Sequence, residues 1–166
     1  MSSCAVDEVG SGRPKTPAVA ADIIIEIGSE IVLIERRNPP PGWAIPGGFV
    51  DPGETVESAA LREAAEETGL EVTLRCLLGC YSDPRRDPRG HTVSLVYVGS
   101  AQGTPEARDD AAAVRLVDPA RITLPLAFDH EHIIADYLVW RDSGCSPGWR
   151  PGAEFLAGGH PGDVRT

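Results

Sequence analysis

The sequence predicts an α+β fold in which helices pack on a mixed β-sheet. Two observations support this prediction. Short segments rich in Val, Ile and Leu are spaced along the chain as strands are, and two helical patterns interrupt and follow them. The 166 residues suffice for one domain with a sizeable core and leave little for a second.

The strands are expected in the following order. The segment "AVAADIIIEIGSEIVLIERR", residues 18–37, predicts two strands joined by a hairpin-type turn at Gly28-Ser29. The proline-rich loop "NPPPG" and the extended segment "WAIPGGFV" follow it. Residues 71–82 and 91–99 alternate loosely between apolar and polar side chains, so both are predicted strands, separated by the charged loop "SDPRRDPRGH". A further short strand is expected at 113–117.

Two helices complete the predicted fold. The first spans about 55–68, with Thr55 as its cap and Gly69 just past its end. The second follows Pro125, with Asp129 as its predicted N-cap and an apolar stripe formed by Ile133, Ile134, Tyr137 and Leu138. We therefore divide the chain into a flexible N-terminal tail (1–16), one domain (17–141) and a Gly/Pro-rich C-terminal tail (142–166).

Composition excludes several classes of protein. A net charge of −10 argues against non-specific nucleic-acid binding, which requires the phosphates to be neutralised. No apolar run is long enough to cross a bilayer, and the N-terminus shows no signal peptide, so we expect a cytoplasmic protein without a membrane partner. The four cysteines are scattered and are expected to be reduced thiols. The oligomeric state stays open, with a homodimer as one alternative.

The first helix carries more glutamates than a surface helix explains. At 100° per residue, Glu63 and Glu67 fall in the same narrow arc as Val56, Ala60 and Ala64. Carboxylates on a packed face are unfavourable unless a cation compensates them. Arg62 alone cannot compensate three glutamates, whereas Mg²⁺ or Mn²⁺ favours such hard oxygen ligands.

The stretch from residue 48 to residue 70 resembles the Nudix box, G-x5-E-x7-R-E-U-x-E-E-x-G-U, where U is a bulky aliphatic residue. The one departure is Ala64, which stands where a larger aliphatic residue is usual. The order of elements is also similar to the Nudix fold, an α/β/α sandwich built on a mixed sheet. The fixed positions of the motif are occupied by Gly48, Glu54, Arg62, Glu63, Glu66, Glu67, Gly69 and Leu70.

This resemblance implies a hydrolase that uses Mg²⁺ or Mn²⁺ to cleave a nucleoside diphosphate linked to another moiety. By position, Glu63, Glu66 and Glu67 are expected to handle metal and water, and the carbonyl of Gly47 is expected to be a further metal ligand. Arg62 would orient the glutamates and Glu54 would support the loop, while Gly48 and Gly69 would be structural.

The resemblance leaves the general base open. Many members of the family take it from an acidic loop after the helix, where Glu106, Asp109 and Asp110 are the candidates here. Many also carry a Glu and a Trp in the next strand, and this chain has Ala113 and Leu116 there. Glu66 is the alternative base.

The substrate is a separate question. The segments "SDPRRDPRGHTVSLVYV", "WAIPGGFVD" and "LAFDH" resemble the ADP-ribose pyrophosphatase branch of the family. The expected substrate-binding residues are Arg36, Trp43, Arg85, Arg86, Arg89 and Phe128, with a core position as the alternative for Trp43. The four histidines form no cluster that would hold a metal, and cap or surface roles are expected for His130 and His132. The alternatives are a hydrolase of nucleoside triphosphates or of another NDP-sugar and, from a different class, a non-catalytic ADP-ribose sensor.

Overall fold

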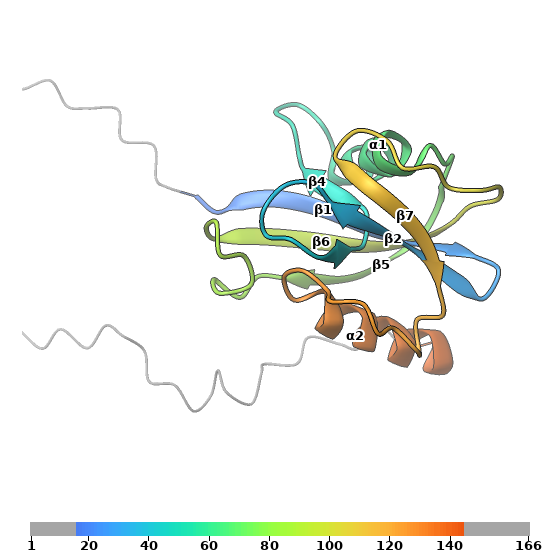
Figure 1. Cartoon of the computed structure of the whole chain (residues 1–166). Helices are drawn as coiled ribbons and strands as arrows, with labels where there is room; N and C mark the ends of the chain where they lie inside the picture. The colour runs from blue at the N-terminus through green and yellow to red at the C-terminus, as the bar shows by residue number, and fades with distance from the viewer. Residues whose placement is uncertain (1–15, 145–166) are drawn as a thin grey trace, which may run out of the picture.

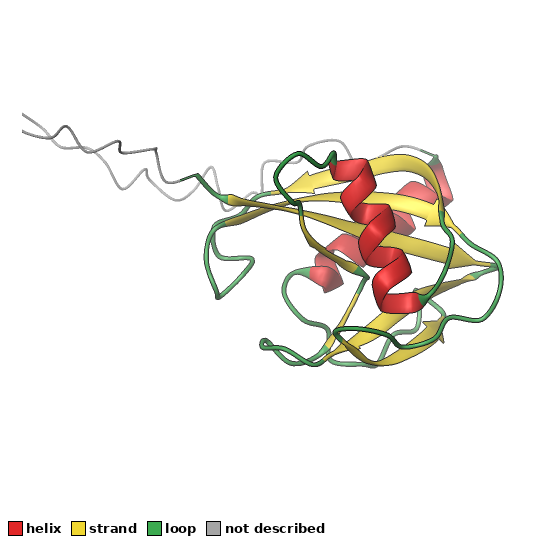
Figure 2. Cartoon of the chain, turned by 90° about the horizontal axis from the view of Figure 1, so that it is seen from above, coloured by secondary structure: helices red, strands yellow, loops and turns green. Residues whose placement is uncertain are grey.

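The computed structural model of the chain describes residues 16–144, which form a layered α+β domain. A mixed sheet lies between the two helices, with α1 on one face and α2 on the other (Figure 1). Seen from above in Figure 2, α1 crosses over the strands. This arrangement confirms the predicted sandwich. The elements are β1 (Ala18–Ile27), β2 (Glu30–Arg36), β3 (Trp43–Ala44), β4 (Gly47–Phe49), α1 (Val56–Thr68), β5 (Thr73–Tyr81), β6 (Thr92–Ser100), β7 (Ala111–Val117) and α2 (His130–Ser143).

The predicted tails lie for the most part outside the described residues. The exception is the start of the C-terminal tail, because α2 continues to Ser143, beyond the expected boundary at residue 141.

The seven strands follow the order β3-β2-β1-β6-β5, with β4 also paired to β1 and β7 to β2. β1 and β6 pair in parallel from Ala18 with Thr92 to Glu26 with Ser100. β1 and β2 form the predicted hairpin at Gly28, whose φ is 63°. Because helices cover both faces, β1 is buried on both sides. Ile23 and Ile25 pack in the cluster with α1, and Ile24 packs in the cluster with α2.

The first helix, α1, is held close to the sheet by small side chains. Ala59, Ala60 and Ala64 are completely buried, so the small residue at 64 fits the tight approach of this helix. Both predicted ends are confirmed: Thr55 accepts a hydrogen bond from the Ser58 N–H, and Gly69 adopts a left-handed conformation with φ 68°. The helix therefore presents its packed face with the predicted glutamates on it.

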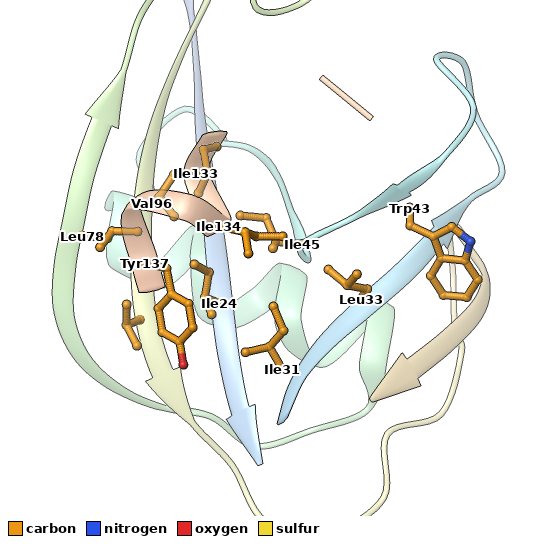
Figure 3. Packing of buried hydrophobic residues seen from close by; sticks show 11 residues of the cluster. Ile24, Ile31, Leu33, Trp43, Ile45, Leu78, Val96, Ile133, Ile134 and Tyr137 are labelled. Atoms are coloured by element: carbon orange, nitrogen blue, oxygen red, sulfur yellow. The ribbon is translucent and has the colours of Figure 1, made fainter. Parts of the chain in front are cut away.

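The second helix, α2, covers the opposite face with its predicted apolar stripe. Ile133, Ile134 and Tyr137 pack against Ile24 and Val96 in the core shown in Figure 3. Asp129 occupies the N-cap position, but its side chain makes no capping hydrogen bond.

Candidate active site

A cleft of about 340 Å³ opens where β1, β4, α1, the end of β2 and the start of α2 meet. Its lining combines acidic side chains from α1 and β1 with arginines from β2 and from the 82–91 loop. The side chains used below are Asp22, Arg36, Arg37, Asn38, Phe49, Arg62, Glu63, Glu67, Arg86, Asp87, Arg89, Asp110, Phe128 and His130.

Arg62 organises the acidic side of the cleft. Its guanidinium donates to both carboxylate oxygens of Glu54 at 3.0 Å, to Glu63 at 2.7 Å and to Glu66 at 3.1 Å. A further bond of 3.1 Å reaches the Phe49 carbonyl. Since a guanidinium has five N–H donors, Arg62 is fully engaged in tying the loop before α1 to the helix. The expected orienting role of Arg62 agrees with this geometry.

The two glycines of the GG pair allow β4 to approach α1 closely. The Gly47 N–H donates to Glu67 Oε2 at 3.0 Å. A Cβ at position 48 would lie 2.2 Å from Glu63 Oε1. Any side chain at position 48 would therefore displace the Glu63 carboxylate, which explains the glycine in physical terms.

Glu67 and Glu63 are carboxylates in an environment that disfavours their charge. Burial raises the pKa of Glu67 to about 8, and the neighbouring Glu63 and Asp22 charges add to this effect. Burial also raises the pKa of Glu63. Both residues are therefore suited to binding a divalent cation, because such an ion supplies a positive charge that balances the carboxylates.

The acidic groups are nevertheless not gathered into a preformed metal cage. Among residues 16–144, no three His, Cys, Asp or Glu side chains converge as a metal-binding group. Glu63 and Glu66 are turned to Arg62, and the Glu66 side chain is 46% exposed and lies outside the cleft lining. The metal-ligand roles of Gly47, Glu63, Glu66 and Glu67 therefore stay predictions.

A second part of the cleft lining is built from arginines and an aromatic ring. The guanidiniums of Arg36 and Arg89 lie 4.7 Å and 5.1 Å from the centre of the Phe128 ring. Asp87, which is buried, holds Arg89 through its two carboxylate oxygens. Three of the expected substrate-binding residues are thus brought together.

The other expected substrate-binding residues lie elsewhere. Arg85 pairs with Asp83 on the surface and is absent from the cleft lining. Arg86 reaches the cleft wall, but its side chain is only 4% exposed and its guanidinium is bound to Asp129. Trp43 is buried in the core cluster under Arg115, which agrees with the alternative prediction of a core position for this residue.

The acidic loop before β7 reaches the cleft through one residue. Asp110 lines it and accepts a hydrogen bond of 3.0 Å from the Asn38 side-chain amide. Asp109, with a positive φ of 45°, uses its carbonyl to accept a bond of 2.6 Å from the Arg37 guanidinium. Glu106 pairs with Arg108 and lies outside the lining. The geometry therefore favours Asp110 among the three candidates for the base.

Asp22 and His130 are among the cleft residues that were not identified as site residues from the sequence. Asp22 is 8% exposed and accepts a hydrogen bond from the Ser94 hydroxyl, and burial raises its pKa to about 6. An acidic residue between the apolar residues of β1 was the available signal. His130 was expected in a cap or surface role, but it is buried and its Nδ1 accepts a bond of 3.1 Å from the Ile45 N–H. The expected cap or surface role of His130 was wrong because the start of α2 packs against the segment that contains Ile45, and this packing buries the His130 ring.

No helix within the described residues is long and apolar enough to span a membrane.

The chain is similar in structure to two proteins that were solved with nucleotide ligands. The bifunctional NMN adenylyltransferase/ADP ribose pyrophosphatase of Francisella tularensis, complexed with AMP and a Mn ion, has a TM-score of 0.68 at 29% identity. The alignment covers 77% of this chain and 43% of that one, so this chain corresponds to less than half of that protein. The NUDIX domain of Shewanella oneidensis NrtR, complexed with ADP ribose, has a TM-score of 0.64 at 26% identity, covering 73% of this chain and 86% of that one.

The sequence comparisons agree with the structural ones. The chain is 50% identical over 129 residues to the ADP-ribose pyrophosphatase of Methanocaldococcus jannaschii, with 76% of each protein covered. Residues 16–137 match the NUDIX domain. With Arg62, Glu63 and Glu67 of the box at the cleft, the chain belongs to the Nudix family.

Proposed function

We propose that this protein hydrolyses the diphosphate bond of ADP-ribose and releases AMP and ribose 5-phosphate. The observation that carries the proposal is that one cleft combines an acidic wall of Glu63 and Glu67 with a wall of Arg36, Arg89 and Phe128. An acidic wall suits a cation that bridges to phosphate, and an arginine-aromatic wall suits the phosphates and the purine. The named activity of the relative with 50% identity supports the same substrate.

The cation in this proposal is Mg²⁺ or Mn²⁺. Glu63, Glu67 and the Gly47 carbonyl would hold it, with Glu66 as a further ligand if it leaves Arg62. When bound, such an ion neutralises diphosphate charge and makes water more acidic. The protein groups do the rest: Arg62 fixes Glu63, and Asp110 accepts the proton from the attacking water. We place this activity in the cytoplasm, with a homodimer as one possible assembly.

A panel of substrates tests the proposal. With Mg²⁺ present, kcat/KM should be higher for ADP-ribose than for ATP, dATP, 8-oxo-dGTP or other NDP-sugars, with AMP and ribose 5-phosphate as products. A nucleoside triphosphate or another NDP-sugar that exceeds ADP-ribose would reject the substrate assignment and leave the family intact.

A second candidate function is a sensor that binds ADP-ribose without cleaving it. The similarity to the NrtR domain complexed with ADP ribose favours this alternative. The intact set of box residues around Arg62 favours the enzyme, because a sensor needs no arrangement for activating water. Tight binding without product formation at any divalent metal concentration would decide for the sensor.

A further inference from the structure

The arginines of the cleft differ in what neutralises them. Within the described residues, five arginines line the cleft, and three of them are held by carboxylates. Those pairs are Arg62 with Glu54, Glu63 and Glu66, Arg86 with Asp129, and Arg89 with Asp87. The charges of these three arginines are therefore already matched by the protein.

The other two, Arg36 and Arg37, are neighbours at the end of β2, and their hydrogen-bond partners are uncharged. Arg36 Nε donates to the Pro40 carbonyl at 3.0 Å, and Arg37 Nη1 donates to the Asp109 carbonyl at 2.6 Å. Between residues 16 and 144 neither guanidinium forms an ion pair. Each guanidinium has five N–H donors, so most of them stay available to a ligand.

Arg36 also lies half-buried beside a second arginine. Arg36 and Arg89 share the Phe128 ring. Burial and then the Arg89 charge lower the pKa of Arg36, and the nearby carboxylates of Glu67, Asp87 and Asp22 offset this only in part. Gathering like charges in a half-buried site is unfavourable for the free protein. A bound anion would relieve that repulsion, so the arrangement favours a ligand of negative charge.

We infer that Arg36 and Arg37 form an anion seat that binds a phosphate group of the substrate through the protein's own charge. This inference rests on the proposed function in one respect, namely that the substrate carries a diphosphate. Arg37, which the sequence analysis did not select, becomes a substrate-binding residue. Its backbone N–H and its guanidinium both bond to the 109–110 segment, so the seat is fixed next to Asp110.

The seat differs from the acidic wall in what it requires. Glu63 and Glu67 repel a phosphate unless a cation intervenes, whereas a guanidinium binds phosphate directly and often through two parallel hydrogen bonds. Binding at Arg36 and Arg37 should therefore persist when divalent cations are removed, and added salt should weaken it.

The test measures binding under conditions that prevent hydrolysis. The full-length protein in excess EDTA is titrated calorimetrically with ADP-ribose and, separately, with inorganic pyrophosphate. Arg37→Gln and Arg36→Gln should each raise Kd about tenfold or more for both probes, which corresponds to about 1.4 kcal/mol. The salt dependence of Kd should also become shallower.

Arg115→Gln is the matched control. Like Arg37, Arg115 is exposed and forms no ion pair among the described residues, but it lies over Trp43 and outside the cleft. The Arg115→Gln variant loses the same charge as Arg37→Gln, and its Kd values for both probes should stay within twofold of those of the wild type.

Three results would overturn the seat: no binding of either probe in EDTA, an Arg37→Gln protein that binds as the wild type does, or an equal loss in Arg115→Gln. Failure of the proposed function would look different. The metal-loaded enzyme would then leave ADP-ribose intact, while pyrophosphate binding in EDTA still depended on Arg37.

Discussion

The guanidinium of Arg86 meets the carboxylate of Asp129 through two parallel hydrogen bonds, Nε to Oδ2 at 2.9 Å and Nη2 to Oδ1 at 2.7 Å. Arg86 lies in the 82–91 loop, and Asp129 immediately precedes α2. The pair also explains why Asp129 does not cap its helix, because its carboxylate is used by Arg86. Phe128 and His130, which flank Asp129, both line the cleft, so this pair fixes part of the cleft wall.

Removing Arg86 should therefore be strongly destabilising. Arg86→Met leaves Asp129 without its partner and removes the cation 3.9 Å from Asp22, and breaking such a buried pair typically lowers the free energy of unfolding by about 3–5 kcal/mol. Adding Asp129→Asn should cost less than the sum of the single changes. Urea denaturation of the two single variants and the double variant measures this. Arg121→Met, which removes the exposed pair with Asp118, is the control and should leave stability unchanged. Additive effects of Arg86→Met and Asp129→Asn would mean that the two residues are not coupled.

His130 should make the protein sensitive to acid. Burial, together with the Arg86 and Arg36 charges, lowers the pKa of His130 to about 3, against an ordinary value of 6.5. Below pH 6.5 the His130 imidazole therefore binds a proton in the unfolded chain but not in the folded one. The free energy of unfolding falls as the pH drops from 6.5 toward 3. Between pH 7 and pH 5 the loss should be on the order of 2 kcal/mol. In His130→Asn, which keeps an acceptor for the Ile45 N–H, this part of the slope should disappear.

Urea unfolding at pH 7, 6 and 5 compares the two proteins. His132→Asn serves as the control because His132 is exposed on the same helix, and it should keep the wild-type slope. Parallel slopes for the wild type and His130→Asn would show that the His130 imidazole accepts a proton in the folded state.

Glu67→Gln should abolish metal-dependent turnover while the fold stays intact. The change keeps the volume and an acceptor for the Gly47 N–H but removes a charge from the acidic wall. Turnover of ADP-ribose with Mg²⁺ should fall well over tenfold, that is, by more than about 1.4 kcal/mol in the activation barrier. Glu71→Gln, at an exposed position just after the helix, is the control and should keep full activity. A loss below tenfold in Glu67→Gln would argue against a metal-site role.

Asp110→Asn should identify the general base. Asp110 alone among the three acidic candidates lines the cleft, so its kcat at saturating substrate should fall by roughly two or more orders of magnitude. Asp109→Asn should have a small effect, because that residue contributes its carbonyl to Arg37, and Glu106→Gln should likewise be nearly neutral. If all three variants keep near-normal kcat, the base is Glu66 or no side chain is required.

The sequence predicted local features well and long-range partners poorly. The strands β1, β2, β5, β6 and β7, both helices, Thr55, Gly69 and the burial of Glu67 follow from periodicity and capping chemistry, which depend on residues a few positions apart. The short strands β3 and β4 lie in the segment that was predicted only as extended. The burial of Arg86 could not be predicted in this way, since a charged loop ordinarily lies in solvent. Its partner Asp129 is 43 positions away and meets it only in the folded domain.

The parallel pairing of β1 with β6 has a consequence for how the protein folds. Ala18 pairs with Thr92, so the central contact of the sheet joins segments separated by almost half of the chain. Such pairing is slow because the entropy of closing a long loop is lost before any stabilising contact forms. Asp22 lies on β1, and Ser94, its hydrogen-bond partner, lies on β6. Asp22, which lines the cleft, therefore gains this partner only when β6 has paired with β1, and a growing chain on the ribosome cannot complete this part of the cleft until β6 has emerged.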